Sequence, residues 1–364
     1  MGHVQREDGR KLYYIKLAYK EPPHARRVYR AVCDPANWVD LHASEDEEVG
    51  EPARYAQWLS DEEVERIQQM RPTNLQFMEP AHEVYQSEQV ESEGIVSTPE
   101  INTYGVERRA LEKHGFFDRV PYNGQGVYVM VADTGYHPHP YLQQRVKYIW
   151  EFTGEGRKGR TDNLHGPWCL GAAIPSRATG VSAKVLKENG TGISTDIIAA
   201  WMRFRKFCLK RGAKGVISCS IGGIREPSQA YADAAQELYQ AGIILVCASG
   251  NEGRRDGIDA PANTPGAVSV GAVDYQGNPA YFANRSSTWS KPDLWACGVD
   301  VLGVGGRMSG TSMATPLVAR AAANLQSVPG YPGMYTPRRR LIAAGGKKKI
   351  LHEGAAVRAL RRHG

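Results

Sequence analysis

The sequence contains no uninterrupted apolar run approaching the roughly 18 residues that a membrane-spanning helix requires. Its first residues, MGHVQREDGRKLYYIKL, are polar and lack the apolar core of a secretory signal. We therefore expect no membrane partner and a cytoplasmic or virion-associated location, with secretion left open. With 41% hydrophobic and 23% charged residues, the composition is that of a globular protein.

Cysteine is scarce, with 6 in 364 residues, and none belongs to a CxxC pair or to a cluster with histidine at metal-ligand spacing. Several stand in apolar, strand-like runs such as GVISCS and IILVCASG, which is typical of buried free thiols. The pattern predicts reduced cysteines in a reducing compartment.

Acidic and basic residues are unevenly distributed. Residues 1–100 hold 11 Lys/Arg against 20 Asp/Glu, whereas residues 326–364 hold 9 Lys/Arg against a single Glu. An acidic front segment beside a basic body can dock through complementary charge. The basic tail can contact phosphates or form a solvated helix, and we favour the helix because no nucleic-acid motif or aromatic interleaving accompanies the tail. Nucleic acid is therefore not expected as a partner.

Residues 1–90 have the pattern of a small α+β domain, in which Ser60 and Glu63 form the capping box of a helix. A polar linker is expected over 91–103. Within the small domain we expect a strand at 11–19, a helix at 22–33, a helix at 60–70 and a closing strand at 74–85 with an edge-type proline.

From residue 104 to residue 335, apolar runs alternate with helical segments, as in GVYVMVADTG, GVISCSIGG and IILVCASGNEG. Continuous apolar strands separated by helices indicate an α/β fold with a buried parallel sheet. Sites in such sheets form at the carboxyl ends of the strands. A basic helical segment at 336–364 is expected to complete or extend this domain.

Four polar residues stand at such strand ends or at the start of expected helices. Serine is a weak nucleophile at pH 7, but His165 can take the proton of Ser312, and Asp133 can fix the tautomer of that histidine. The side-chain amide of Asn251 and the backbone N–H of Ser312 can bind the oxyanion that forms when a carbonyl is attacked.

The order of these residues, in the segments ADTG, LHG, SGNEG and GTSMATP, resembles the subtilisin-type serine peptidases over residues 104–325. The resemblance implies a subtilisin-like, three-layer αβα fold with a mostly parallel central sheet. It implies a triad of Asp133, His165 and Ser312, with Asn251 in the oxyanion hole. It also implies an endopeptidase that hydrolyses protein or peptide substrates through an acyl-enzyme, without a metal or organic cofactor.

The resemblance further implies a cleft in which the substrate backbone pairs as an added strand. Ordinary glycine-rich turns are the alternative at these positions. The two edges of the cleft lie in KVLKENGTG and SCSIGG and consist of Gly190, Thr191, Gly192, Ser220, Ile221 and Gly222.

Alignment with the family places Glu252 and Asp259 near the primary specificity pocket. Carboxylates there would favour Arg or Lys before the cleaved bond, through charge-assisted hydrogen bonds. They can equally face solvent, and the segment HEVYQ near the end of the small domain offers no basic residue. Both interpretations stay open.

The domain at 1–90 resembles the inhibitory propeptide of this family, with its helix-then-strand ending. The resemblance implies an intramolecular inhibitor in a self-processing zymogen, and we expect self-cleavage between Tyr85 and Ile101, in the linker region. The pair Arg108 and Arg109 can be a secondary cleavage point or part of a surface helix.

The segment HGPWCLG departs from the HGTHVAG of the family, because Trp168 replaces a histidine that is not the base. The loop after this helix is short and lacks the insertion that carries calcium in many relatives, so we expect no metal there. A non-catalytic relative that binds peptides or serves a larger assembly is the alternative to an active enzyme.

Overall fold

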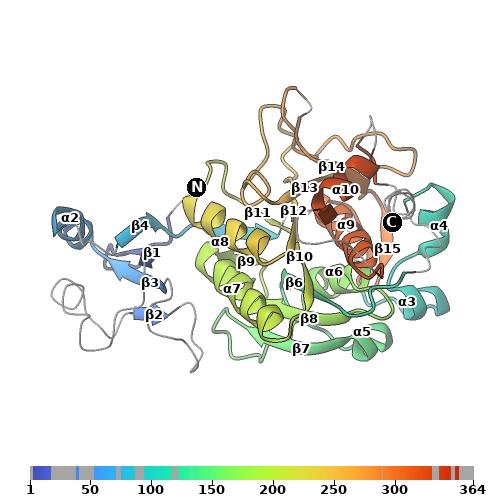
Figure 1. Cartoon of the computed structure of the whole chain (residues 1–364), viewed down its shortest axis with the longest axis horizontal. Helices are drawn as coiled ribbons and strands as arrows, with labels where there is room; N and C mark the ends of the chain where they lie inside the picture. Colours follow the sequence, from blue (N-terminus) through green and yellow to red (C-terminus); the bar gives the residue numbers. More distant parts are fainter. Residues whose placement is uncertain are drawn as a thin grey trace.

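Apolar runs of the chain form a central sheet of parallel strands (Figure 1). The computed structural model describes residues 3–17, 38–40, 53–70, 75–86, 94–116, 122–288, 290–329, 336–345 and 349–351. The order across the sheet is β14 (Leu294–Cys297), β13 (Val268–Val273), β12 (Ile244–Ala248), β10 (Lys214–Cys219), β6 (Val127–Asp133), β8 (Thr179–Lys184) and β7 (Val146–Glu151). Each neighbouring pair is parallel, which accounts for the continuous apolar runs.

Helices cover both faces of this sheet. Val129 and Val131 of β6 face the core formed with α6 and α9, whereas Met130 and Ala132 face the core formed with α7 and α8. Alternate residues of one strand therefore build both cores, and the expected αβα layering is confirmed. The covering helices are α6 (His165–Ala173), α9 (Thr311–Gln326), α7 (Ser194–Lys210) and α8 (Gln229–Gln240).

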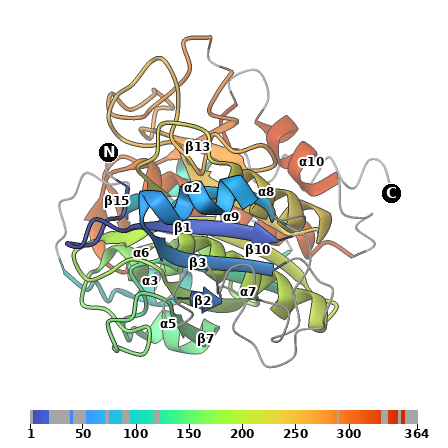
Figure 2. The same ribbon diagram turned by 90° about the vertical axis from the view of Figure 1, so that its left-hand side faces the viewer.

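An antiparallel sheet forms the N-terminal unit, and Figure 2 shows its helix and strands in front of the main body. Its order is β2 (Trp38–Asp40), β3 (Ala53–Leu59), β1 (Lys11–Leu17) and β4 (Leu75–Pro80), with α2 (Asp61–Met70) packed against it. Ile15 and Leu59 pack with Ile67 of α2, while Leu12 and Tyr14 face the core that contains α7 and α8. The sheet is therefore buried on both faces.

The capping box predicted for α2 is present. The N–H of Ser60 donates to Oε2 of Glu63 at 2.8 Å, and the N–H of Glu63 donates to Oγ of Ser60 at 3.2 Å. The helix expected at 22–33 lies outside the described residues.

The single closing strand expected at 74–85 is two strands that belong to different sheets. β4 ends at Pro80, which has no N–H to extend a ladder. The chain then turns and forms β5 (Glu83–Gln86), which pairs with β9 (Thr191–Ile193) and β11 (Ile221–Gly222) of the main body.

Part of the linker expected at 91–103 packs on the main body. Thr98 caps α3 (Pro99–Tyr104) by accepting the N–H of Ile101 at 3.2 Å, and Ile101 is fully buried in the large core. The remaining elements are α4 (Arg108–Lys113), α5 (Pro140–Arg145), β15 (Val301–Gly303), β16 (Gly306–Met308) and α10 (Thr336–Ala344).

The first part of the basic C-terminal segment also joins the main body. Leu341 of α10 and Leu351 are buried in the large core, and Ile350 forms a parallel bridge with Trp295 of β14. Residues 352–364 lie outside the described residues. Among the helices that the structure describes, none is long and apolar enough to cross a membrane.

Candidate active site

A carboxylate and an imidazole meet at the carboxyl end of β6. Asp133 is the last residue of β6 and His165 is the first residue of α6, and both are buried. Nδ1 of His165 lies 2.7 Å from Oδ1 of Asp133, which also accepts the N–H of Thr134 at 2.7 Å. An ionised carboxylate in this position keeps the proton on Nδ1 and leaves Nε2 as the basic nitrogen of the ring.

Backbone contacts hold the start of α6 against the loop that follows β6. Gly166 donates its N–H to Oγ1 of Thr134 at 3.0 Å, and His165 donates its N–H to Oδ1 of Asn163 at 3.0 Å. A Cβ at position 166 would lie 2.7 Å from the backbone oxygen of Gly135. Glycine therefore permits the close approach that brings His165 to the end of β6.

Ser312 is the second residue of α9 and is fully buried. Pro316, one turn further along α9, has no N–H to donate to the carbonyl of Ser312. That carbonyl instead accepts from the hydroxyl of Ser220 at 3.0 Å and from the thiol of Cys169 at 3.7 Å. Since Cys169 belongs to α6, these contacts bring Ser312 to the helix that begins with His165.

Asn251 lies in the loop after β12, next to the start of α9. Its Oδ1 accepts the backbone N–H of Thr311 at 2.9 Å and the hydroxyl of Thr311 at 2.8 Å. These two bonds fix which way the amide is turned. Its Nδ2 is buried and has no hydrogen-bond partner among the described residues, so a donor is aimed at the space beside Ser312.

The residues expected to form the edges of a cleft do lie on the two sides of one extended segment, which is β5 of the N-terminal unit. Gly222 pairs antiparallel with Tyr85 on one side, while Gly192 pairs with Val84 on the other. The N–H of Gln86 donates to the carbonyl of Gly190 at 2.9 Å. Ile221 and Thr191 are in the same two strands, and Ser220 precedes β11.

Two groups of hydrogen bonds, one of them to a carboxylate, hold the N-terminal unit on the main body. The carboxylate of Glu79 in β4 accepts from the hydroxyl of Ser228 at 2.6 Å and from the N–H groups of Gln229 and Ala230 at 3.0 and 3.1 Å, at the start of α8. A carboxylate at a helix N-terminus is stabilised by the free N–H groups and the helix dipole. Three residues after Glu79, the backbone of His82 exchanges two hydrogen bonds with Ser194, each of 3.0 Å.

The expected pair of carboxylates flanks the same cleft, but only one of them is exposed. The side chain of Glu252 is 35% exposed, whereas that of Asp259 is fully buried. Arg254 contacts both carboxylates, and burial, followed by the charge of Glu252, raises the pKa of Asp259 to about 7. Arg254 stands two positions after Glu252 and was not expected at this site from the sequence.

One group among the described residues combines three side chains of metal-binding types. Single ligand atoms of Asp133, His165 and Cys169 lie within 4.8 Å of one another. Because the carboxylate and the imidazole are already hydrogen-bonded to each other, this group consists of that pair and a neighbouring thiol. The five cysteines that the structure describes are free and buried, in agreement with the expected thiols.

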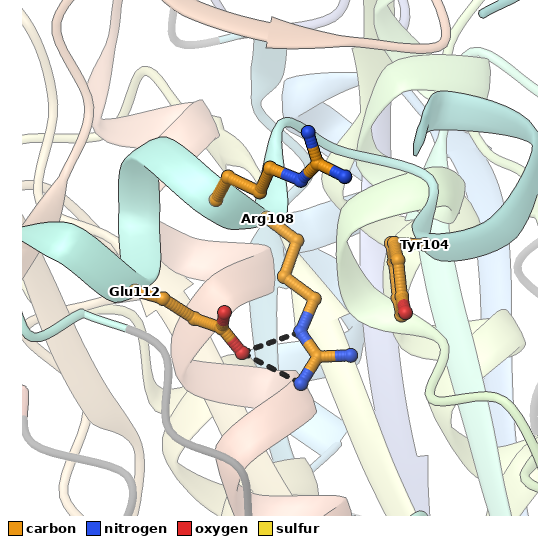
Figure 3. Close-up of a pocket in the computed structure, with 4 residues that line it drawn as sticks. Tyr104, Arg108 and Glu112 are labelled. Carbon is orange, nitrogen blue, oxygen red and sulfur yellow. Dashed lines mark hydrogen bonds and ion pairs between the residues drawn. The ribbon is translucent and has the colours of Figure 1, made fainter. Parts of the chain in front are cut away.

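A separate cavity of about 430 Å³ lies between α3 and α4 and is lined by Tyr104, Arg108, Arg109 and Glu112 (Figure 3). Arg108 is held by Glu112 at 2.6 Å and lies over the ring of Tyr104, 4.4 Å from its centroid. Both arginines belong to α4. The dibasic pair is thus part of a helix, which favours the surface-helix interpretation over a secondary cleavage point.

Several curated proteins are similar to this chain. Proteinase R of Parengyodontium album is 35% identical over 221 residues, which cover 56% of this chain and 54% of that protein. Subtilisin-like protease 2 of Pseudogymnoascus destructans is 33% identical over 236 residues, covering 61% and 57%. Alkaline serine protease ver112 of Corniculantispora psalliotae is 31% identical over 294 residues, covering 75% and 71%. The chain thus spans little more than half the length of the first two.

The expected cytoplasmic or virion-associated location is contradicted by these relatives. The fungal relatives are secreted, extracellular proteases. The expectation depended on the polar start of the sequence and on the free thiols. Neither observation determines the compartment, because buried thiols are protected from oxidants wherever the protein resides.

Solved structures agree with the fold described above. Sphericase superposes with a TM-score of 0.60 at 25% identity, covering 68% of this chain and 91% of that one. A cold adapted subtilisin-like serine proteinase gives a TM-score of 0.57 at 25% identity, covering 65% and 93%. The profile of the subtilase family, Peptidase S8, matches residues 124–356, which is more than half of the sequence. This chain therefore belongs to the subtilase family.

Proposed function

We propose that this chain is a serine endopeptidase of the subtilisin type, made as a zymogen that processes itself. The observation that carries the proposal is the 2.7 Å contact between Asp133 and His165, next to the helix start that holds Ser312. The amide of Asn251, turned by its two bonds to Thr311, completes the set of groups that acyl transfer needs.

In the proposed reaction, Oγ of Ser312 attacks the carbonyl carbon of the peptide bond while Nε2 of His165 takes the hydroxyl proton. Asp133 stabilises the resulting imidazolium through Nδ1. The oxyanion of the tetrahedral intermediate accepts from Nδ2 of Asn251 and from the backbone N–H of Ser312. The imidazolium then protonates the leaving amine as the carbon–nitrogen bond breaks, which leaves an acyl-enzyme on Ser312.

Water completes the cycle by the same route. His165 removes a proton from the water that attacks the acyl carbon, a second oxyanion occupies the same donors, and the ester bond to Ser312 breaks. The acid product leaves after the imidazolium returns its proton to Oγ. Proteins or peptides in extended conformation are the proposed substrates, since β9 and β11 leave room for one strand between them.

The N-terminal unit is proposed to be the intramolecular inhibitor of this enzyme. Its strand β5 lies where a substrate strand would lie, and Val84 of that strand is fully buried. Glu79 at the start of α8 supports this docking, and so does the ion pair between Lys16 and Asp233. In that ion pair the N-terminal unit supplies the positive charge, which is the reverse of the polarity expected from the sequence. Self-cleavage is expected after β5 and before α3, within the window between Tyr85 and Ile101.

Intact mass and N-terminal sequencing of the purified full chain test this function. The wild type is expected to lose about 90 residues, whereas Ser312→Ala stays full length. Ser309→Ala is the matched control, because the Ser309 hydroxyl accepts the N–H of Asp300 and has no proposed role in catalysis. If neither the wild type nor the control is processed or labelled by a serine-directed phosphonate, the chain is a non-catalytic peptide-binding relative.

A further inference from the structure

The guanidinium group of Arg254 contacts two carboxylates, those of Glu252 and Asp259. Nη2 of Arg254 is 3.1 Å from Oε2 of Glu252 and also contacts Oδ1 of Asp259. The side chain of Arg254 is 20% exposed, whereas that of Asp259 is fully buried. Arg254 therefore reaches the buried carboxylate from the open side of the loop.

The side-chain amide of Asn284 forms hydrogen bonds with the backbone of this loop and with both carboxylates. Its Oδ1 accepts the backbone N–H groups of Glu252 and Arg254 at 3.2 and 2.9 Å. Its Nδ2 lies 2.5 Å from Oε2 of Glu252 and 3.4 Å from Oδ2 of Asp259. Because Asn284 is fully buried, the loop and both carboxylates are held in one geometry.

These acids belong to the wall of the cleft. Gly250, with φ of +99°, precedes Asn251, and a Cβ at this position would collide with Asn284 and with the carboxylates of Glu252 and Asp259. Ala260, next to Asp259, forms an antiparallel bridge with Ile224, two residues after β11, and a Cβ at Gly223 would lie 3.1 Å from the ring of Tyr85 in β5. The pKa of Tyr85 is accordingly raised, first by burial and then by the charges of Glu252 and Asp259. The acidic pair therefore faces the strand that occupies the cleft.

The chemistry of this pocket matches a guanidinium group. Two carboxylates offer acceptors to the planar fork of N–H donors that arginine carries, and the contact with Asp259 is shielded from water. With Arg254 in place, both carboxylates already have a guanidinium partner inside the pocket. A second guanidinium would have to displace Arg254 or approach it against like charge.

We propose that Arg254 is a built-in occupant of a guanidinium-binding specificity pocket, and that it disfavours substrates with arginine or lysine before the cleaved bond. This inference rests on the proposed peptidase function and names the substrate preference of that site. Glu252 and Asp259, which from the sequence could favour a basic residue before the cleaved bond, are instead paired with Arg254 of the same chain. Peptides with an uncharged residue at that position are the preferred substrates, and removal of Arg254 opens the pocket to basic ones.

The experiment compares four enzymes that are expressed as full chains and assayed after self-processing: wild type, Arg254→Ala, Arg255→Ala and Arg254→Ala with Asp259→Asn. Arg255 is the matched control, because its guanidinium donates to the carbonyls of Ala283 and Tyr281 and not to the acidic pair. Each is assayed with two peptides that differ only in Arg or Ala before the cleaved bond, and Ser312 is titrated with a phosphonate.

Arg254→Ala is expected to raise the ratio of kcat/KM for the Arg peptide over the Ala peptide by about tenfold or more. Arg255→Ala leaves this ratio at the wild-type value, and the added Asp259→Asn cancels the gain. An unchanged ratio in Arg254→Ala, with Ser312 fully titrated, overturns the inference and leaves the proposed function standing.

A second measurement tests the pocket without catalysis. Benzamidine, which carries an amidinium group of similar shape and charge, is added to the same pocket variants in a Ser312→Ala chain that also carries Val84→Asp, because the added carboxylate is expected to release β5 from the cleft. A rise in Tm is expected for Arg254→Ala alone, and its absence overturns the inference. If the phosphonate titrates none of the chains, the proposed function fails. The benzamidine result still shows whether the pocket binds an amidinium group once Arg254 is removed.

Discussion

Asn251 and Thr311 are joined by two hydrogen bonds, in which Oδ1 of the asparagine accepts both the backbone N–H and the hydroxyl of the threonine. An asparagine amide has one acceptor end and one donor end. Because Thr311 occupies the acceptor end twice, Nδ2 is turned toward the space beside Ser312. Thr311 therefore determines the orientation of the proposed oxyanion donor.

Asn251→Leu removes this donor while it keeps a side chain of similar size. We expect kcat to fall on the order of 10²–10³, the size of loss seen when one oxyanion donor is removed from a serine protease, with little change in KM. Steady-state kinetics of the processed enzyme measures the effect. A large rise in KM with unchanged kcat would instead indicate that Asn251 binds substrate in the ground state.

A matched pair at the neighbouring position tests the role of Thr311. Thr311→Ser keeps both donors to Oδ1, so kcat is expected to stay close to the wild-type value. Thr311→Val removes only the hydroxyl, and the loss of one buried hydrogen bond is expected to lower kcat by roughly tenfold. Equal kcat values for the serine and valine variants would contradict the proposed role of the hydroxyl.

The fold around the proposed site was easier to predict from the sequence than the N-terminal unit. Asp133 and Asn251 each follow a buried parallel strand, and such strands end at a common edge, so their meeting follows from local patterns. The alternation around Pro80 indicated one strand. Which sheet each half joins depends on partners that are distant in the sequence, β1 for the first half and β9 for the second, and no local pattern contains that information.

Arg254 was missed for the same physical reason. Its neighbours in the sequence, NEGRR, are typical of a solvated loop, and nothing local distinguishes Arg254 from Arg255. The difference lies in Asn284, which comes from a later segment, and in Asp259, because both side chains contact Arg254. The helix α2, in contrast, was predicted with its cap because Ser60 and Glu63 are three residues apart.

Val84 is the point at which a single change should release β5. Its side chain is fully buried and its backbone pairs with Gly192. Val84→Asp places a carboxylate without a counter-ion in an apolar site, which costs several kcal/mol. In the Ser312→Ala chain, hydrogen exchange at residues 83–86 is expected to lose its protection. Glu83→Gln, at an exposed neighbouring side chain, should leave it intact, and equal protection in both variants would refute the docking proposal.

Glu79 is expected to contribute to docking through the start of α8. Glu79→Gln keeps the shape of the side chain but removes the charge that three donors share. The free energy of unfolding of the Ser312→Ala chain should fall by about 1 kcal/mol, as for the loss of a helix cap. Glu65→Gln, exposed on α2, makes the same charge change away from the interface and should have no such effect.

Docking of the N-terminal unit should also depend on pH through His82. Burial, followed by the charge of nearby His3, lowers the pKa of His82 from its ordinary value of 6.5, although Glu79 and Glu226 act in the opposite direction. The docked state thus binds fewer protons at this ring than the unfolded chain does. The stability is fully present above pH 6.5 and is lost as the pH falls from 6.5 through the lowered pKa.

Urea unfolding of the Ser312→Ala chain at about pH 5.5 and about pH 7.5 measures this dependence. His82→Gln has no charge at either pH, so the loss of stability on acidification should be smaller in this variant than in its parent. The buried acids Asp196 and Asp259, whose pKa values are raised to about 7, make the folded state more stable on acidification, which is opposite to the effect of His82. Because both chains contain these acids, the difference between the chains reports His82 alone. An identical loss in parent and variant would show that His82 does not couple docking to pH.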